Sequence, residues 1–593
     1  MTDRFRALIL TLPLFFASSA SAATLPPGTP VEGGIIADVL PSGLQIITDT
    51  IGGQVPPTFP MGNLTGGACC IDLGPLGCAA MLFYDVTNLS ADVSIQSITM
   101  TPETGQVRAD VVLDVVVNDA ANPFTFNTSG GCSFATGDCA AMWIGPVSID
   151  ISLEIKASVT DPDGPGGTPP IVDITVPVPV HNLDNAITAN DVHSNGCQAD
   201  LLLSLADFLG FSIADLLLGD VVDYVENDLP ASVEAAVEAG FQAAILQDVL
   251  DVMGKQVAYH VYPDGVPITA EAMRITMGGE FNALTVDRCV AGWPSDGFTS
   301  TPSLTPSVAQ QRPSGGSYDA GVIVDDDFVN SALHAFWLSG LLCQSVDSDL
   351  TGISLSSDFL GAALGTEVQA EFEYVFFDEG PQPLVVRTVP TIPPEVSYGG
   401  PYDLTVHLDG LGLSFHSVIL GRMAHLFTVA IDAAIGVDIG FTPYGEIAIT
   451  PFIDTSNLNP RIVLNEMMPD VDEAIVSNIG PFLDGLVNDF AADLLVTQYI
   501  GPFVLFDLAI IDGEAGAVGQ GDYLELFALL GTPIPGNSGG SSCAAAAGCA
   551  DPATCLNTQN CALELSGKPS RIPGMAWFLI PLVALWRSRR ARE

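Results

Sequence analysis

The stretch that decides the fold is residues 84–118, YDVTNLSADVSIQSITMTPETGQVRADVVLDVVVN. Val, Ile and Leu alternate with polar residues along it, and Asn, Pro and Gly divide it into pieces of strand length. The stretches VSIDISLEIKASVTD (147–161) and PPIVDITVPVPV (169–180) repeat the pattern. The alternation predicts an antiparallel meander over residues 80–180.

The apolar period then becomes helical. In residues 230–253, Val233, Val237, Phe241 and Ile245 recur every four residues, which predicts one amphipathic helix. A very apolar stretch before it, residues 200–228, is interrupted by Asp207 and Asp215, which would make a membrane span costly.

A second unit follows a Ser/Thr/Pro-rich linker. In residues 324–342, VDDDFVNSALHAFWLSGLL, three Asp residues suit a helix N-terminus and Gly340 suits its end. Val329, Leu333 and Phe336 form the apolar face of this predicted helix. Strand patterns resume, beginning with TEVQAEFEYVFFD (366–378), and a further helix is predicted over 469–495. Each half thus combines an antiparallel sheet with a long helix, so the predicted class is α+β, with strongly curved sheets wrapped on amphipathic helices.

Charge excludes several partners. Residues 24–567 hold nine Lys/Arg and 67 Asp/Glu, a balance of 9 − 67 = −58. Nucleic acid and anionic headgroups both need clustered cations, so neither is an expected partner.

Both ends of the chain are predicted to be targeting signals. Residues 1–23 have the basic start, apolar run and small residues of a secretory signal. Residues 568–593 place a 15-residue apolar run before an Arg cluster, which resembles a bacterial C-terminal sorting signal; a simple stop-transfer anchor is the alternative. The protein is therefore expected to be exported to the cell envelope or surface, with release after tail cleavage left open.

Cysteine usage agrees with export, because twelve Cys suit an oxidising compartment. Four of them, Cys543 to Cys561, recur with five residues between neighbours and favour a disulfide-tightened stalk at 536–567 over a metal site. Cys132 and Cys139 flank a turn and are expected to pair. Cys69, Cys70 and Cys78 share one loop, and the other connections stay open.

The order of these stretches resembles the bactericidal/permeability-increasing and lipopolysaccharide-binding protein family. The resemblance rests on residues 84–118, on 195–237 with Cys197, on 324–342, and on RTVPTIPPEVSY (387–398) followed by YDLTVHLDGLGLSF (402–415). It covers roughly residues 75–530. It implies two elongated barrels end to end, at 24–298 and 318–535, joined by the linker 299–317.

The resemblance also implies apolar tunnels that hold acyl chains, with no chemistry and no cofactor. Two departures matter. The family ties a strand to its first long helix by a disulfide, but residues 230–253 contain no Cys, which leaves Cys289 as a substitute partner for Cys197. The family's endotoxin binders use a cationic tip, which this chain lacks, so neutral or zwitterionic lipids are favoured over anionic ones. The candidate lipid contacts come from the two predicted helix faces; their plainer interpretation is ordinary core: Val233, Val237, Phe241, Ile245, Val329, Leu333 and Phe336.

The sequence contains no motif that strongly indicates catalysis or metal binding. Gly536-Asn-Ser-Gly-Gly has the spacing of a nucleophile elbow, but Pro533 and Pro535 precede Ser538 where a strand is needed. His407, His416 and His425 recur nine apart and would have to be brought together by hairpins to bind zinc. The three Asp at 325–327 favour helix capping over a cation site. We therefore expect a lipid-binding or lipid-transfer protein; the alternatives are a structural or adhesive surface protein with packed barrels and, less favoured, a secreted hydrolase.

Overall fold

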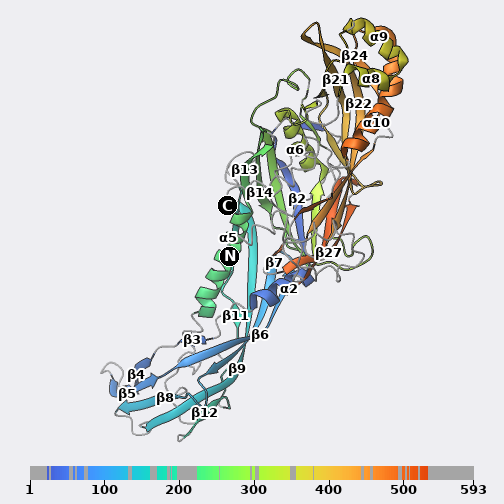
Figure 1. Cartoon of the computed structure of the whole chain (residues 1–593). Helices are drawn as coiled ribbons and strands as arrows, with labels where there is room; N and C mark the ends of the chain where they lie inside the picture. The colour runs from blue at the N-terminus through green and yellow to red at the C-terminus, as the bar shows by residue number, and fades with distance from the viewer. Residues whose placement is uncertain are drawn as a thin grey trace, which may run out of the picture.

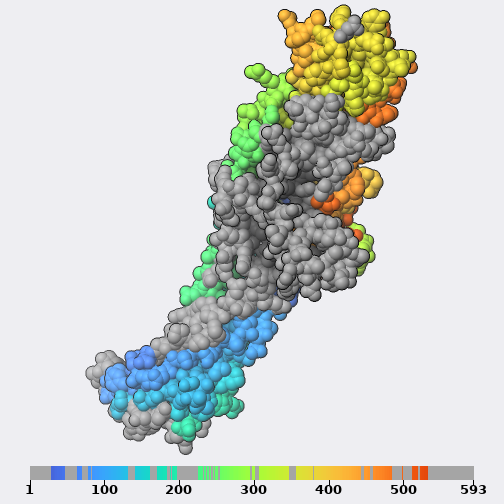
Figure 2. All heavy atoms as spheres, in the orientation of Figure 1, coloured from blue at the N-terminus to red at the C-terminus, as the bar shows by residue number. Residues whose placement is uncertain are grey.

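The computed structural model describes most of residues 23–531, and residues 1–22 and 532–593 lie outside the described part. Within 23–531 the structure leaves out 26–27, 53–57, 61–62, 73–77, 131–136, 161–169, 183–186, 189, 196–223, 253, 294, 296, 301–305, 347–354, 378, 443–445, 455–457, 492–496, 501–503, 506–507 and 519–520. The described chain is mostly β-structure with some helices, arranged as an elongated molecule (Figures 1 and 2). Every strand pairing in it is antiparallel.

A ten-stranded sheet forms one end of the molecule and curls into a half-barrel (blue and cyan in Figure 1). Its path is β3-β6-β7-β9-β8-β5-β4, and β10, β11 and β12 also pair with β9. Asn88 (φ 62°) and Gly105 (φ 86°) take the left-handed conformation in the turns on either side of β6. The predicted antiparallel strands are present, but their order is not the predicted meander, because β5 pairs with β4 and β8 rather than with β6, and β7 pairs with β6 and β9 rather than with β8. The strands are β3 (Thr58–Pro60), β4 (Leu64–Asp72), β5 (Cys78–Thr87), β6 (Ser90–Glu103), β7 (Gln106–Val117), β8 (Phe124–Gly130), β9 (Gly137–Thr160), β10 (Ile171–Thr175), β11 (Val180–His181) and β12 (Val192–Ser194).

A central eight-stranded sheet joins parts of the chain that are far apart in sequence. Its order is β13-β14-β15-β2-β17-β28-β27-β26. The strand β2, from near the start, lies between β15 and β17, and β28, from near residue 530, pairs with β17. The strands are β2 (Val31–Val39), β13 (Leu246–Val252), β14 (Lys255–Gly265), β15 (Met273–Ala283), β17 (Ala320–Asp325), β26 (Val504–Leu505), β27 (Leu508–Val518) and β28 (Tyr523–Gly531). Separately, β1 (Ala23–Leu25) pairs with β16 (Phe298–Ser300).

A third sheet and three helices form the other end (yellow and orange in Figure 1). The sheet contains β18 (Ser345–Val346), β19 (Leu384–Pro390), β20 (Glu395–Tyr398), β21 (Leu404–Ile419), β22 (Arg422–Phe441), β23 (Ile447–Asp454), β24 (Arg461–Leu464) and β25 (Gln498–Ile500). The helices are α8 (Ser357–Leu364), α9 (Thr366–Phe376) and α10 (Asp472–Ala491), the last preceded by the 3-10 turn η4 (Pro469–Val471). The predicted helix at 469–495 is confirmed as far as Ala491. Leu360, Ile475 and Ile479 from these helices pack in one core with Phe415 and Phe427.

Three helices lie along the first and central sheets. The helix α2 (Pro41–Gly52) packs along β6, and α5 (Leu229–Ala244), which follows the π-helical turn η3 (Tyr224–Asp228), packs along β10. The helix α6 (Asp326–Ser339) has both predicted ends. The Asp325 carboxylate accepts from the Asp327 backbone N–H at 2.7 Å, and Gly340 stops the helix with φ 76°.

Two element predictions are wrong. The helix predicted over 230–253 ends at Ala244, and β13 follows it, pairing with β14 through a turn in which Gly254 has φ 78°. The segment 366–378, predicted as a strand, begins with the helix α9. In both cases the apolar residues fit either period, and packing against neighbouring elements decides between them.

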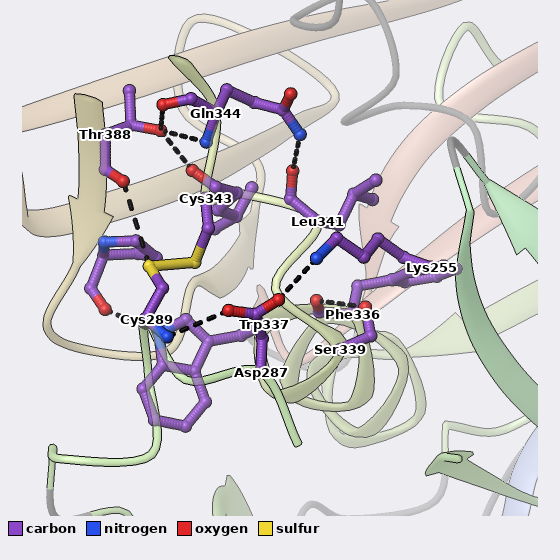
Figure 3. The surroundings of a disulfide bond; sticks show 12 residues. Lys255, Asp287, Cys289, Phe336, Trp337, Ser339, Leu341, Cys343, Gln344 and Thr388 are labelled. Carbon is purple, nitrogen blue, oxygen red and sulfur yellow. Dashed lines mark hydrogen bonds and ion pairs between the residues drawn. A yellow bond between two sulfur atoms is a disulfide. The ribbon is translucent and has the colours of Figure 1, made fainter. Parts of the chain in front are cut away.

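Two disulfides lie in the described residues and suit an extracellular protein. Cys69 pairs with Cys78, within the predicted cluster. Cys289 pairs with Cys343, so the expectation that Cys289 would serve Cys197 is wrong (Figure 3). The signal, the stalk and the tail lie outside the described residues. The predicted Cys132–Cys139 pair also falls outside them, because Cys132 and the Cys139 side chain are not described. In the part of the chain that the structure describes, no helix is long and apolar enough to cross a membrane.

Candidate functional site

The inner face of the ten-stranded sheet is aliphatic along β7, β9 and β10, and Phe124 and Phe126 add aromatic rings to it on β8. Along β7, Val107, Ala109, Leu113 and Val115 are buried, whereas Arg108 points to solvent from the other face. The register places Ile151 and Leu153 of β9 opposite Val111 and Ala109 on the same face. Val172 and Ile174 of β10 extend this face further and are also buried.

The helix α5 lies over the β10 side of this face. Phe241 of α5 and Val225 of the preceding turn are buried in the same apolar cluster as Val172 and Ile174. The cluster continues through the central sheet to Phe336 of α6. The sheet and both helices therefore share one apolar interior.

Part of this interior is incompletely covered. Sixteen partly buried apolar side chains pack against the buried cluster, and eight of them, all larger than Ala, lie on β6, β7, β9 and α5. We call them the apolar strip: Ile95, Met100, Val111, Ile155 and Val159 on the sheet, and Leu229, Val233 and Val237 on α5. None of the eight can carry a charge, and the Met100 thioether is their one weak hydrogen-bond acceptor, so the strip suits apolar ligands.

Polar groups gather near the α5 end of the strip. His181 of β11 and Glu226 of η3 are joined at 3.0 Å between Nε2 and Oε1. One turn and a half along α5 from Val233, the Glu238 carboxylate accepts from the Ile174 backbone N–H at 3.4 Å. These contacts tie α5 to the sheet without crossing the strip.

The seven residues predicted from the sequence fall into two groups. Val233 and Val237 lie on the strip, Phe241 is buried beneath it, and Ile245 lies just beyond the end of α5. The α6 residues pack on both sides of the helix: Phe336 is buried in the cluster shared with the first sheet, Leu333 is buried in a second cluster with Trp337, and Val329 is partly buried against that second cluster. The strip residues of β6, β7 and β9 were missed, although their period-two alternation marked one face as apolar.

The structure also places the residues considered as metal ligands from the sequence, the three histidines and the three Asp residues. His416 and His425 face each other across β21 and β22 with ring centroids 5.2 Å apart, but His407 pairs with Ala434 further along the hairpin. The three histidines therefore do not converge. Carboxylate oxygens of Asp325, Asp326 and Asp327 lie within 4.8 Å of one another, with Asp325 capping α6 and Asp327 accepting from Ser300 Oγ at 2.6 Å.

Three hydroxyl–imidazole pairs among the described residues have the reach required for nucleophilic catalysis: Ser397 with His407 and Thr428 with His425, each at 2.8 Å, and the more buried Ser295 with His334. Ser295 Oγ and His334 Nε2 are 2.7 Å apart. Burial lowers the pKa of His334 to about 4, which makes it a weak general base at neutral pH. The pair instead fixes the loop after β15 to α6. Ser538 lies outside the described residues.

The cations of residues 24–567 are mostly committed to carboxylates. Six of the nine form ion pairs: Arg108 with Glu103 and Asp110, Lys156 with Glu154, Lys255 with Asp287, Arg274 with Asp38, Arg312 with Asp512, and Arg461 with Asp432. The Lys255–Asp287 pair stands beside the Cys289–Cys343 disulfide (Figure 3). A phosphate-rich ligand would therefore have to displace existing pairs.

Comparisons with known proteins give a structural likeness. No family model matches the chain, and no curated protein matches it in sequence. The chain is similar in structure to lipopolysaccharide binding protein, at 13% identity and a TM-score of 0.42, covering 86% of this chain and 99% of that one. It is also similar to P47 of Clostridium botulinum E1, at 9% identity and a TM-score of 0.24, covering 86% and 100%. Identities and TM-scores this low do not carry the function of either protein over to this chain.

Proposed function

We propose that this chain is an exported lipid-binding protein that holds acyl chains against the apolar strip and performs no chemistry. The observation that carries the proposal is the set of partly buried apolar side chains on α5 and on the inner face of the first sheet, in a chain that is otherwise strongly acidic. Each methylene buried there would contribute about 0.8 kcal/mol, so six methylenes would supply roughly 5 kcal/mol. Binding energy of this kind needs no fixed polar partner.

The charge supports neutral or zwitterionic lipids over anionic ones. Residues 24–567 carry −58 by count, and six of their nine cations are already paired. An anionic headgroup would meet repulsion that salt only partly screens. Shuttling between membranes, with the tail at 568–593 as a membrane anchor, belongs to the same proposal.

Two elongated units, 24–298 and 318–535, are the proposed architecture, with the strip in the first. In the second unit Ile475, Ile479, Phe415 and Phe427 are fully buried. Partly buried apolar side chains, including Leu411, Ile419 and Ile462, also pack against this core, and a structural or adhesive surface role is the alternative for the second unit.

The test uses the exported, disulfide-intact protein purified without detergent. Its organic extract, analysed by mass spectrometry against an unrelated acidic exported protein, is expected to contain near-stoichiometric amounts of one or two neutral or zwitterionic lipid classes. A double variant, Val233→Gln with Val237→Gln, keeps good helix formers on α5 but makes the strip polar, and should lower lipid content at least threefold.

The matched control is Val463→Gln on β24, which is exposed and distant from the strip in the fold. It should retain the wild-type lipid content. An extract equal to that of the control protein, together with no uptake of a fluorescent fatty acid, would reject lipid binding and leave the surface scaffold.

A further inference from the structure

The face of the central sheet that points away from α6 carries a buried ion pair. Asp38 of β2 is fully buried and accepts two hydrogen bonds from Arg274 of β15, from Nε and Nη2, each at 2.6 Å. Arg274 also donates from Nη1 to the Pro306 carbonyl at 3.1 Å. One carboxylate and one backbone oxygen therefore accept three hydrogen bonds from this guanidinium.

A second buried carboxyl stands in the same polar layer. Glu525 of β28 is 1% exposed, and neither of its carboxyl oxygens has a hydrogen-bond partner among the described residues. A Cβ on Gly321 of β17 would lie 2.9 Å from Glu525 Oε1 and 3.8 Å from the Asp38 Cβ. Glu525 thus extends across Gly321 toward Asp38, where the nearby cation is already neutralised.

Residues 306–318, which we call the strap, cover this layer. Arg312 Nη1 pairs with Asp512 of β27 at 2.7 Å, and Ser314 Oγ donates to Glu514 of β27 at 2.6 Å. The Tyr318 hydroxyl donates to the Ala309 carbonyl and closes the strap on itself.

Two close approaches place the strap on either side of Glu525. A Cβ on Gly321 would lie 3.2 Å from the Tyr318 ring, and a Cβ on Gly516, the register partner of Glu525 on β27, would lie 2.9 Å from Pro313. The absence of side chains at both glycines lets the strap lie flat over the carboxyl.

The charged and titratable groups around Glu525 come from four elements. They are Asp38 of β2, Arg274 of β15, Arg312 and Tyr318 of the strap, and Asp512 and Glu514 of β27. Burial, reinforced by the Asp38 charge and opposed by Arg274, raises the pKa of Glu525 to about 8. Burial, with the Glu525 and Asp38 charges, also raises the pKa of Tyr318, which stays neutral.

We propose that Glu525 is a proton-operated latch that holds the strap closed over the central sheet. The protonated carboxyl fits the buried polar layer beside Asp38 without adding a charge. The ionised carboxylate requires water, and water reaches it when the strap lifts. This inference stands on the central sheet and is independent of lipid binding.

Linkage gives the direction of the pH response. The lifted strap exposes a Glu with an ordinary pKa of 4.5, whereas the closed strap holds one with a pKa of about 8. Opening therefore releases one proton between these values. The ratio of open to closed strap should rise by up to about tenfold per pH unit as pH rises toward 8, and should level off above it.

The experiment is hydrogen exchange of peptides covering the strap in the full-length protein from pH 6 to 9, with rates corrected for intrinsic exchange. Wild-type protection is expected to fall up to tenfold per pH unit below pH 8 and then flatten. Glu525→Gln, which is neutral at every pH, should keep the strap protected with no slope.

Glu514→Gln is the control, because it loosens a strap contact without touching the latch. Its protection should be lower at every pH with the wild-type slope. If Glu525→Gln fails to fold, Glu525→Met provides the neutral side chain. A flat wild-type profile between pH 6 and 8, or an unchanged slope in the neutral variant, would overturn the proposal.

Discussion

Single cations carry unusual weight in this chain because there are so few of them. Arg274 is the clearest case: it is the sole cation that contacts the fully buried Asp38 within the described residues. Taking two charges out of water is costly, and their attraction offsets that cost only while both partners remain. Removal of Arg274 alone would leave an uncompensated carboxylate between β15 and β17.

We therefore expect Arg274→Met to lower the free energy of opening of the central sheet by about 3–5 kcal/mol at neutral pH. Native-state hydrogen exchange of the β2 and β15 amides measures this quantity. Combining it with Asp38→Leu should recover most of the loss, since no buried charge then remains.

The control is Arg108→Met, which removes a solvent-exposed pair with Glu103 and Asp110. It should leave the amides of β6 and β7 unchanged, because exposed pairs contribute little. An Arg274→Met variant as stable as this control would contradict the buried-pair account.

At the scale of elements, the sequence predicted those whose pattern has a single interpretation. The strands of 84–118 alternate polar and apolar residues over most of their length, and the α6 ends carry an acidic cap and a glycine, so both could be assigned. In α9 the apolar residues fit two periods: Val368, Ala370, Phe372 and Tyr374 alternate as in a strand. The structure buries Val368, Phe372 and Val375 at helical spacing and exposes Tyr374.

The candidate site was predicted in part for the same reason. Val233 and Val237 follow from the helical period of α5, but that period alone could not reveal that β13 pairs with β14 from Leu246 onward. Nor could it distinguish the partly buried face of α5 from the more buried face of α6. That difference depends on which sheets pack on each helix, and such contacts are between residues far apart in sequence.

The connection between α6 and the loop after β15 gives a prediction for this scale. Disulfide mapping of the non-reduced protein by mass spectrometry should recover a peptide containing Cys289 linked to one containing Cys343, and a second link between Cys69 and Cys78. In Figure 3 the first bond lies beside Trp337 and Thr388, and the Trp337 indole N–H ties α6 to β19 by donating to the Pro390 carbonyl at 3.0 Å. A Cys197–Cys289 peptide in place of the first would contradict this arrangement.

At the scale of the whole molecule, two ends with different interiors meet in one central sheet (Figure 1). The first end carries the apolar strip, and the second packs α8, α9 and α10 on a core of its own. The strongly negative charge favours solubility and repels anionic surfaces. We therefore assign the proposed lipid binding to the first end.

The most direct test of that claim is photolabelling with a fatty acid that carries a diazirine near the end of its chain. The label is loaded onto the exported protein, activated, and located by peptide mass spectrometry. The account predicts adducts on α5 and on the facing strands β7 and β9, reduced when Val233 and Val237 are both Gln. Saturable labelling confined to the third sheet and its helices, or no saturable labelling, would contradict it.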